Sequence, residues 1–404
     1  MDNLIFHIDV NSAFLSWEAT YRIKELNETE DIRNIPSIIG GDETKRHGIV
    51  LAKSTPAKAF GIVTGEPIVK ARQKCPDIKI FPTNFKIYKE YSDKFISLLK
   101  EYAPVVEQFS IDEAFLNMTG TNKLYGEPVT FAHKLKDEIK NRLGFTVNIG
   151  ISSNKLLAKM ASDFQKPDRV HTLFPDEIPQ KLWPLDIREL LYVGKSTANK
   201  LHSLGINTIG DAANTDINLL TYHFKKQGSM IWNYANGIDD STVAISPTAN
   251  KGYGNSTTLS EDITNNEHAK IIILSLCENI GARLREDKKY IGVVSVSLVD
   301  NDFNHYSKQT SLASSTNVTE EIYDVACKLF DSCWKGEPIR LIGVSTSKAT
   351  DDKYSQYNMF DMDKYDKLSK LDSAIDNIRN KYGDDSVKRA RFINSKHNHM
   401  TGKK

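Results

Sequence analysis

Apolar positions along the first 170 residues follow two different periods. A continuous apolar run at residues 4–8 is typical of a buried strand, and alternating apolar positions across residues 145–151 are typical of another. Between them, apolar side chains recur at steps of three and four across residues 85–102 and across residues 131–139. This spacing predicts two amphipathic helices, the first ending before Pro104 and the second near residue 144.

Short apolar segments between these two helices predict a β-hairpin. Residues 105–106 lead into its bend and residues 115–116 lead out of it, while Asp112 and Glu113 lie at the bend itself. The order strand, helix, hairpin, helix, strand is that of a ferredoxin-like sheet backed by helices. We therefore expect Asp9, which ends the first strand, to lie on the same sheet face as the two acids.

The rest of the chain divides into smaller segments. Residues 36–83 mix short strands with polar turns, and residues 171–240 form short helices. A polar link at 241–248 leads to an α/β segment at about 250–350, in which one sheet and two helices are expected. One last helix is marked by Leu368, Leu371, Ile375 and Ile378. At 404 residues, an α+β protein of more than one domain is predicted.

Composition indicates where the protein is located in the cell more clearly than what it does. Formal net charge is only +1, so any phosphate-binding surface must be a local patch. The four cysteines have no CxxC spacing, which argues against a zinc site or a disulfide framework and favours reduced thiols in the cytoplasm. We expect neither a secretory signal nor a membrane span, because no apolar window approaches about 20 residues.

Asp9, Asp112 and Glu113 are the candidate metal ligands. A buried ionised carboxylate is costly unless a cation or hydrogen-bond donors compensate it, so converging carboxylates favour a bound cation. Oxygen donors with positions left for phosphate suit Mg²⁺, and two such ions about 3.5–4 Å apart can promote phosphoryl transfer. A solvated acidic turn at the hairpin is the alternative. The third acid, far away in sequence, favours the metal site.

Polar residues near these acids suggest a phosphate-binding environment. Asn11 or Ser12 can cap the helix that follows, so that its backbone N–H groups point at a triphosphate. Lys155 and Lys159 lie four residues apart on a later helix, and an ordinary solvated face is the favoured interpretation for Lys155. Lys166, just past the end of that helix, is the better candidate for a phosphate contact.

Three further motifs carry alternatives. The string GGDE at residues 40–43 resembles the signature of diguanylate cyclases, but the aromatic residue and strand expected after it are missing. Gly194 and Lys195 lie where a helix-hairpin-helix would hold a DNA phosphate through backbone N–H groups, and an ordinary helix turn is the alternative. Residues 356–360 have the form of a short peptide that docks into a partner's pocket, which chance could also produce.

Four motifs, taken in order and spacing, resemble Y-family translesion DNA polymerases, particularly the UmuC/DinB-like proteins of bacteria. They are HIDVNSAF from residue 7, AKSTPAKAFG from residue 52, FSIDEAF from residue 109 and GISSNKLLAKMASDFQKP from residue 150. The resemblance covers about residues 1–350. In that family Asp9, Asp112 and Glu113 would bind two Mg²⁺ ions, with the carbonyl of Val10 as a further ligand.

The resemblance also implies how nucleotide is bound. The expected substrate-binding residues are Ser12, Ala13, Phe14, Thr55, Lys58 and Lys166. Phe14 is expected to act as a steric gate that stacks under the sugar and excludes a 2′-hydroxyl, and Lys58 and Lys166 to contact the triphosphate. DinB-type members usually carry tyrosine and arginine at the positions of Thr55 and Lys58. Because lysine lacks the planar fork of arginine, a nucleotide clamp that is softer or differently arranged is expected.

The family architecture assigns the chain to domains. It implies a catalytic palm at residues 1–15 and 79–170, fingers at 16–78, a thumb with the helix-hairpin-helix at 171–240 and a DNA-gripping little finger at about 250–350. Residues 351–404 form a tail, in which Gln356, Met359 and Phe360 resemble the motif that holds the replication sliding clamp.

Together these features predict a low-fidelity, template-directed DNA polymerase that adds dNTPs to a primer 3′-hydroxyl during DNA damage bypass and SOS repair. Its expected partners are primer-template DNA, dNTP, the sliding clamp and accessory subunits, with no membrane. Two alternatives remain: a nucleotide cyclase on a related palm, and a catalytically idle homologue that serves as a DNA- or clamp-bound scaffold. The intact acids argue against the scaffold, which has no need to crowd carboxylates.

Overall fold

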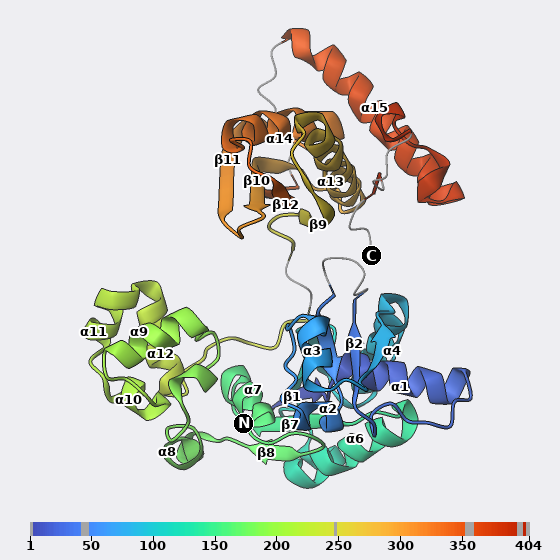
Figure 1. The fold of residues 1–404 in the computed structure, drawn as a ribbon. Helices are drawn as coiled ribbons and strands as arrows, with labels where there is room; N and C mark the ends of the chain where they lie inside the picture. Colours follow the sequence, from blue (N-terminus) through green and yellow to red (C-terminus); the bar gives the residue numbers. More distant parts are fainter. Residues whose placement is uncertain (1–2, 42–47, 246–248, 352–358, 394–398, 401–404) are drawn as a thin grey trace. The chain divides into compact units, whose positions relative to one another are not determined.

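A computed structural model describes residues 3–41, 48–245, 249–351, 359–393 and 399–400. The described chain forms two compact units, the first extending to Pro247 and the second containing residues 248–404. Figure 1 shows both units and labels many of their helices and strands. All four cysteines are free thiols, as expected from their spacing. In the described part of the chain, no helix is both long enough and apolar enough to cross a membrane.

The main sheet of the first unit is ferredoxin-like, with a fifth strand added. β1 (Ile5–Val10) lies at its centre and is antiparallel to both β6 (Glu113–Asn117) and β7 (Val147–Ser152). β5 (Val105–Gln108) forms the predicted hairpin with β6, and β8 (Val170–Thr172) runs parallel to β7. The order β5-β6-β1-β7-β8 confirms the predicted topology.

Side chains of β1 alternate between the two faces of this sheet. Phe6, Ile8 and Val10 enter the main core, where they meet the helices α1 (Ala13–Glu25), α4 (Phe85–Tyr102) and α6 (Pro128–Leu143). Each large apolar side chain buried there contributes about 1.5–3 kcal/mol to stability. The ends of α4 and α6 are as predicted, since α4 ends before Pro104 and Gly144 adopts a φ of 89° at the end of α6.

The opposite face of the sheet is covered by α7 (Lys155–Asp163). The helix backbone lies so close to β7 that a Cβ at Gly150 would be 2.0 Å from the carbonyl oxygen of Ala158. Only glycine allows this approach, and Asn154 fixes the start of the helix by accepting a hydrogen bond from the Leu157 N–H. Consequently α7 lies directly over the face that carries Asp9.

A small mixed sheet follows α1 in the sequence. β2 (Ser37–Gly40) is antiparallel to β3 (Val50–Lys53) and parallel to β4 (Lys79–Pro82). The short helices α2 (Thr55–Ala59) and α3 (Ile68–Lys74) pack against it around a separate apolar cluster. This agrees with the small mixed segment predicted for residues 36–83.

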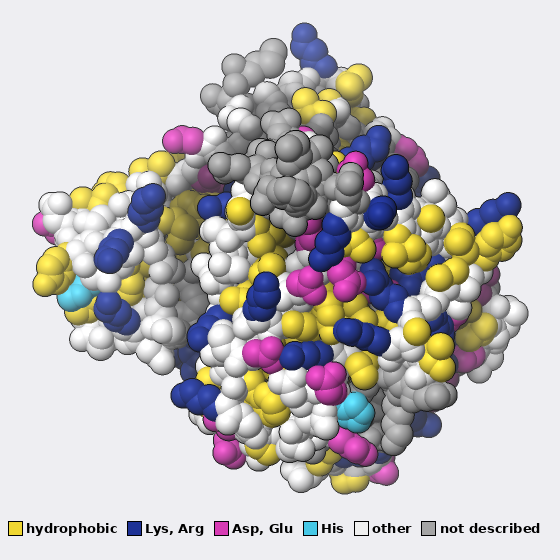
Figure 2. All heavy atoms as spheres, turned by 90° about the horizontal axis from the view of Figure 1, so that it is seen from above, with side chains coloured by type: hydrophobic (Ala, Val, Ile, Leu, Met, Phe, Trp, Pro, Cys, Tyr) yellow, Lys and Arg dark blue, Asp and Glu magenta, His cyan; other side chains and the backbone are white. Residues whose placement is uncertain are grey.

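Short helices complete the first unit, as predicted for residues 171–240. They are α8 (Ile178–Lys181), α9 (Lys195–Ser203), α10 (Ile209–Asn214), α11 (Ile217–Phe224) and α12 (Lys226–Ala235). At the left of Figure 2 these helices present Lys and Arg side chains beside hydrophobic ones. Within residues 171–240, Tyr192 and Tyr222 are 55% and 81% exposed, and each lies within three residues of an exposed lysine in the sequence.

The second unit is a four-stranded antiparallel sheet with helices on one face. Its strands are β9 (Gly254–Ile263), β10 (Ile291–Asp300), β11 (His305–Thr316) and β12 (Ile339–Ser347), in the order β11-β10-β12-β9. The helices α13 (Asn266–Glu286) and α14 (Thr319–Cys333) share one apolar core with the strands. The predicted sheet with two helices is therefore confirmed.

The predicted last helix is present as α15 (Met359–Tyr382), but its predicted apolar stripe is only partly covered, with Leu368 and Ile375 half-buried. Asp372 and Arg379 are 3% and 6% exposed, whereas Leu371 and Ile378 are 48% and 39% exposed. The reason is electrostatic: α13 offers charged partners to the polar side of α15. A hydrophobic stripe alone gives no information about such partners.

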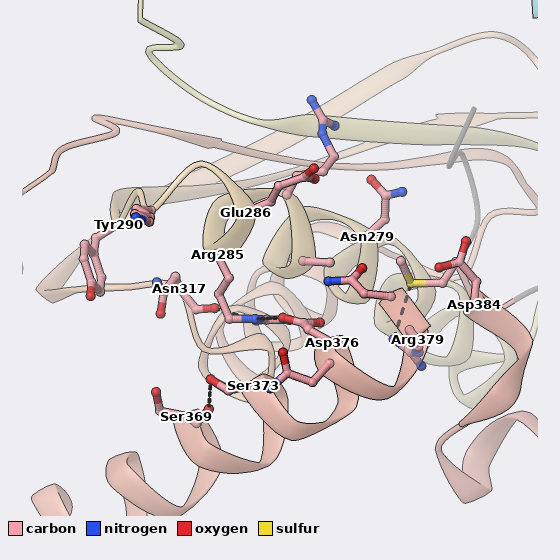
Figure 3. A pocket seen from close by; sticks show the side chains of 16 residues that line it. Asn279, Arg285, Glu286, Tyr290, Asn317, Ser369, Ser373, Asp376, Arg379 and Asp384 are labelled. Atoms are coloured by element: carbon pink, nitrogen blue, oxygen red, sulfur yellow. Dashed lines mark hydrogen bonds and ion pairs between the residues drawn. The ribbon is translucent and has the colours of Figure 1, made fainter. Parts of the chain in front are cut away.

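A buried ion cluster holds α15 against α13. Glu278, 3% exposed on α13, lies 2.8 Å from nitrogens of both Arg379 and Arg389. Arg285 binds Asp376, and Figure 3 shows this pair beside a polar pocket between the two helices. The pocket lies where α13 and α15 pack against each other.

Candidate functional site

Asp9 and Glu113 lie directly opposite each other on adjacent strands. β1 and β6 pair so that these two residues are register partners, on the sheet face that α7 covers. Asp112 precedes β6, and its carbonyl oxygen accepts a hydrogen bond of 3.0 Å from the Val10 N–H. The structure thus brings the three acids predicted from the sequence to one edge of the sheet.

Two of these carboxylates are each bound by a lysine. The Lys159 ammonium lies 2.9 Å from Glu113 Oε1, and the Lys166 ammonium lies 2.8 Å from Asp9 Oδ1. Lys159 was not among the residues predicted for the site. The sequence does place Lys159 one turn after Lys155, on the helix that crosses the acid-bearing face. This position predicts a contact with the acids only if the side of α7 that faces the sheet is already known.

The facing acids differ in their readiness to ionise. Burial raises the pKa of the Asp9 carboxyl to about 7, against the opposing effect of Lys166. Burial acts in the same direction on Glu113, but contacts with His7 and Lys159 outweigh it and hold the Glu113 pKa below its usual value. Of the two opposed carboxyls, Glu113 therefore carries negative charge more readily.

His7 lies next to Glu113, and the sequence predicts it only as part of the apolar run at residues 4–8. It is fully buried, and burial lowers its pKa, which favours the neutral imidazole. Its Nδ1 lies 2.7 Å from Ser162 Oγ, while its Nε2 lies 3.8 Å from Glu113 Oε2. The histidine and α7 together limit the directions in which the Glu113 side chain can turn.

A pair of asparagines fixes the segment that carries Lys166. The Asn148 amide donates to the carbonyls of Ser162 and Gln165, while Asn11 Oδ1 accepts the N–H of Asp168. This places Lys166 beside Asp9. Of the two predicted caps, Ser12 is at the N-cap position of α1, but at a φ of 47° it makes no side-chain capping bond, and the Asn11 amide is engaged by these partners instead. The helix starts where it was predicted, but the side-chain bonds of Asn11 could not be predicted because its partners are distant in sequence.

The acid cluster has the chemistry of a magnesium site, but its side chains are not arranged around a cation. No three acidic, histidine or cysteine side chains in the described ranges form a group ready to hold a metal ion. Lys159 and Lys166 occupy oxygens of two acids, and Asp112 Oδ1 accepts a 2.6 Å hydrogen bond from Ser110. Hard oxygen donors suit Mg²⁺, so the donor types fit and side-chain rearrangement is required.

Lys155 does not lie on a solvated face, contrary to the prediction from sequence. Its side chain is only 13% exposed, its ammonium lies 2.8 Å from Glu107, and it lies 4.8 Å from the centre of the Phe115 ring. The predicted solvated face is therefore wrong for this residue. The close packing of α7 on the sheet, which brings Lys155 over β5 and β6, explains the difference.

The start of α1 carries three predicted substrate contacts. Phe14 is half-buried and stacks on Tyr88 at a ring-centre distance of 4.8 Å, with Phe85 packed edge-on against it. Ser12 is exposed and Ala13 is buried. Phe14 therefore has a fixed aromatic support, and Ser12 lies two residues from Val10, close to the acids in the chain.

The remaining predicted residues lie farther along. Thr55 and Lys58 are exposed on α2, and no contact of the described residues joins them to the acids. Gly194 and Lys195 are exposed at the start of α9, where a Cβ on Gly194 would meet open space. Gln356 lies outside the described residues, as do Asp42 and Glu43 of the GGDE string, and the side chains of Met359 and Phe360 are not described.

Family models match most of the chain. The impB/mucB/samB family matches residues 8–163, and the C-terminal domain of that family matches residues 250–359. The thumb domain of DNA polymerase iota matches residues 189–239. These ranges contain the acids, α7, and the four strands of the second unit.

Known proteins of similar sequence align with nearly the whole chain. A DNA polymerase IV of Clostridium acetobutylicum is 49% identical over 96% of this chain and 98% of its own length. A DNA polymerase IV of Alkaliphilus oremlandii is 39% identical over 97% and 100%, and DNA polymerase IV 2 of Bacillus subtilis is 33% identical over 96% and 94%. In structure, a chimeric Y-family DNA polymerase matches at a TM-score of 0.72, with 24% identity over 86% of this chain and all of that one.

Proposed function

This chain belongs to the impB/mucB/samB family of Y-family DNA polymerases, and on that premise we propose that it carries out template-directed translesion synthesis, in which a dNTP is added to a primer 3′-hydroxyl. The primer 3′-hydroxyl loses its proton to water and its oxygen attacks the α-phosphate of the nucleotide. A new P–O bond forms, the bond between the α- and β-phosphates breaks, and pyrophosphate leaves with the electrons of the broken bond. Family membership favours this reaction over the cyclase and the idle scaffold.

The observation that supports the proposal most is the register pairing of Asp9 with Glu113, beside Asp112. Asp9, Asp112, Glu113 and the Val10 carbonyl would hold two Mg²⁺ ions, which when bound make the primer oxygen a better nucleophile and stabilise the leaving pyrophosphate. Lys166 binds the triphosphate after leaving Asp9, and Lys58 adds a second cationic contact. Backbone N–H groups at Ser12 and Ala13 complete the phosphate environment.

We assign the ferredoxin-like sheet to a palm at residues 1–15 and 79–170, with fingers at 16–78 and a thumb at 171–240. Residues 250–350 would grip DNA as a little finger, and Gly194 and Lys195 would contact a DNA phosphate. The residues Gln356, Met359 and Phe360 would bind the sliding clamp. We further propose that the polymerase acts in the SOS response, together with accessory subunits.

Phe14→Ala is expected to relax the exclusion of ribonucleotides. The Phe14 ring is supported by Tyr88 and Phe85, so it cannot move aside easily when a 2′-hydroxyl approaches. Loss of a steric contact of this kind is expected to raise the rNTP-to-dNTP ratio of kcat/KM roughly a hundredfold or more. Single-nucleotide insertion kinetics measure that ratio, and equal discrimination by mutant and parent would exclude Phe14 as the gate.

The polymerase itself is tested by primer extension past a defined lesion, with purified protein, Mg²⁺ and dNTPs. We expect extension on undamaged template and past the lesion. Incubation with GTP and no primer is the parallel reaction for the cyclase alternative. A cyclic product from GTP, or no extension on either template, would refute the assignment.

A further inference from the structure

The two lysines bound to the acid cluster are held very differently. Lys159 lies within α7, its side chain is 10% exposed, and its ammonium lies 5.6 Å from the centre of the Phe109 ring. Lys166 lies beyond the end of α7, and its side chain is 36% exposed. Lys166 also lies 2.8 Å from Asp163, an exposed second partner. One ammonium is thus enclosed and the other can move.

Resting on the polymerase function proposed above, we propose that Lys159 is a resident counter-cation of Glu113. It occupies one oxygen of that carboxylate in the nucleotide-free enzyme, and so keeps the affinity of the acid cluster for divalent cations low until a nucleotide is bound. Lys159 is in this sense a positioning residue, because it acts through Glu113.

Charge balance explains why nucleotide would change this affinity. Two ammonium groups offset two of the three carboxylates, so a divalent cation approaching the free enzyme meets little net negative charge. A nucleotide brings its own negative phosphates, and Lys166 can leave Asp9 to bind them because its side chain reaches solvent. Lys159 remains in place, since Phe109 and α7 enclose it.

The chain offers a matched control one turn earlier on the same helix. Lys155 is 13% exposed and binds Glu107 at 2.8 Å, so it resembles Lys159 in burial and in its ion pair. Glu107, however, lies on β5 and is not among the proposed metal ligands. Lys155→Met therefore removes the same charge from the same helix without freeing an oxygen of the acid cluster.

The test is Mn²⁺ binding to the full chain without nucleotide, followed through the electron paramagnetic resonance signal of free Mn²⁺. Removing a positive charge next to a ligand carboxylate is expected to tighten Mn²⁺ binding in Lys159→Met by roughly tenfold, whereas Lys155→Met should change it by less than about threefold. Lys159→Arg, which keeps the charge, should bind Mn²⁺ as weakly as the parent. Weaker binding in Lys159→Met, or an equal effect in both methionine variants, would overturn the proposal.

A second measurement needs only the parent protein and guards against a variant that does not fold. Mn²⁺ should bind more tightly when a non-hydrolysable dNTP is present, after correction for Mn²⁺ bound by the nucleotide alone, and equal affinity in the two states would overturn the proposal. These readouts do not require catalysis. If the parent fails to extend a primer while Lys159→Met still binds Mn²⁺ more tightly, the polymerase function fails and the role of Lys159 stands.

Discussion

Glu113→Ala is expected to lower the rate of primer extension by at least about a thousandfold, because several kcal/mol of transition-state stabilisation depend on the metal-binding carboxylates. Glu113 faces Asp9 across the β1–β6 pair, and the structure provides no second carboxylate at that register position. Asp9→Ala and Asp112→Ala are expected to have effects of similar size. Single-turnover primer extension at saturating dNTP measures the loss.

Glu107→Ala is the control for this experiment. Glu107 lies on the other strand of the same hairpin and pairs with a lysine of α7 at 2.8 Å, as Glu113 does at 2.9 Å. It is not a proposed ligand, so its loss should change extension by no more than about threefold, in line with a single ion pair of modest strength. Extension that survives Glu113→Ala, or that falls equally in both variants while the fold is intact, would remove the assignment of the acids.

Arg379→Met should destabilise the second unit by about 3 kcal/mol. Breaking a buried ion pair by removing one partner costs about 3–5 kcal/mol, because the remaining charge stays in a poorly solvated place. Glu278 is 3% exposed and would keep only part of its cationic environment. Urea unfolding of the full chain measures this change, and hydrogen exchange of β10 and β12 amides assigns it to the second unit.

Lys270→Met is the matched comparison, on the helix α13 that carries Glu278. Lys270 pairs with Asp331, which is 45% exposed, so its loss should cost no more than about 1 kcal/mol. Replacing both Glu278 and Arg379 by methionine should recover part of the stability, because the buried carboxylate is removed with its cation and Arg389 keeps Glu320 and Asp372 as partners. Similar stabilities for Arg379→Met and Lys270→Met would show that the buried cluster contributes little.

Much of the fold could be predicted from sequence because its signals are local. The alternating positions of β7, the helical period of α4 and the glycine at residue 144 each depend on neighbouring residues. The convergence of Asp9 with the hairpin followed from the order of elements alone. The resemblance to a known family then supplied roles for residues such as Phe14.

The contacts that were not predicted depend on how elements meet. Lys155 was expected in solvent and Lys159 had no assigned role, because the side of α7 that faces the sheet is set by its approach to Gly150. Asn11 or Ser12 was expected to cap a helix; Ser12 has the N-cap position, whereas the partners of Asn11 lie far along the chain. Likewise α15 turns its charged side inward because α13 carries Glu278, which no local pattern of α15 reveals.

The position of Glu278 also bears on how the protein is made. Because they precede Arg379 and Arg389 in the chain, α13 and all four strands of its sheet emerge from the ribosome before these two arginines do. During this interval the nascent segment contains Glu278 without Arg379 and Arg389, so it cannot bury the Glu278 carboxylate with its cationic partners. Interrupted translation in this interval would leave an open intermediate, which chaperones or proteases would intercept.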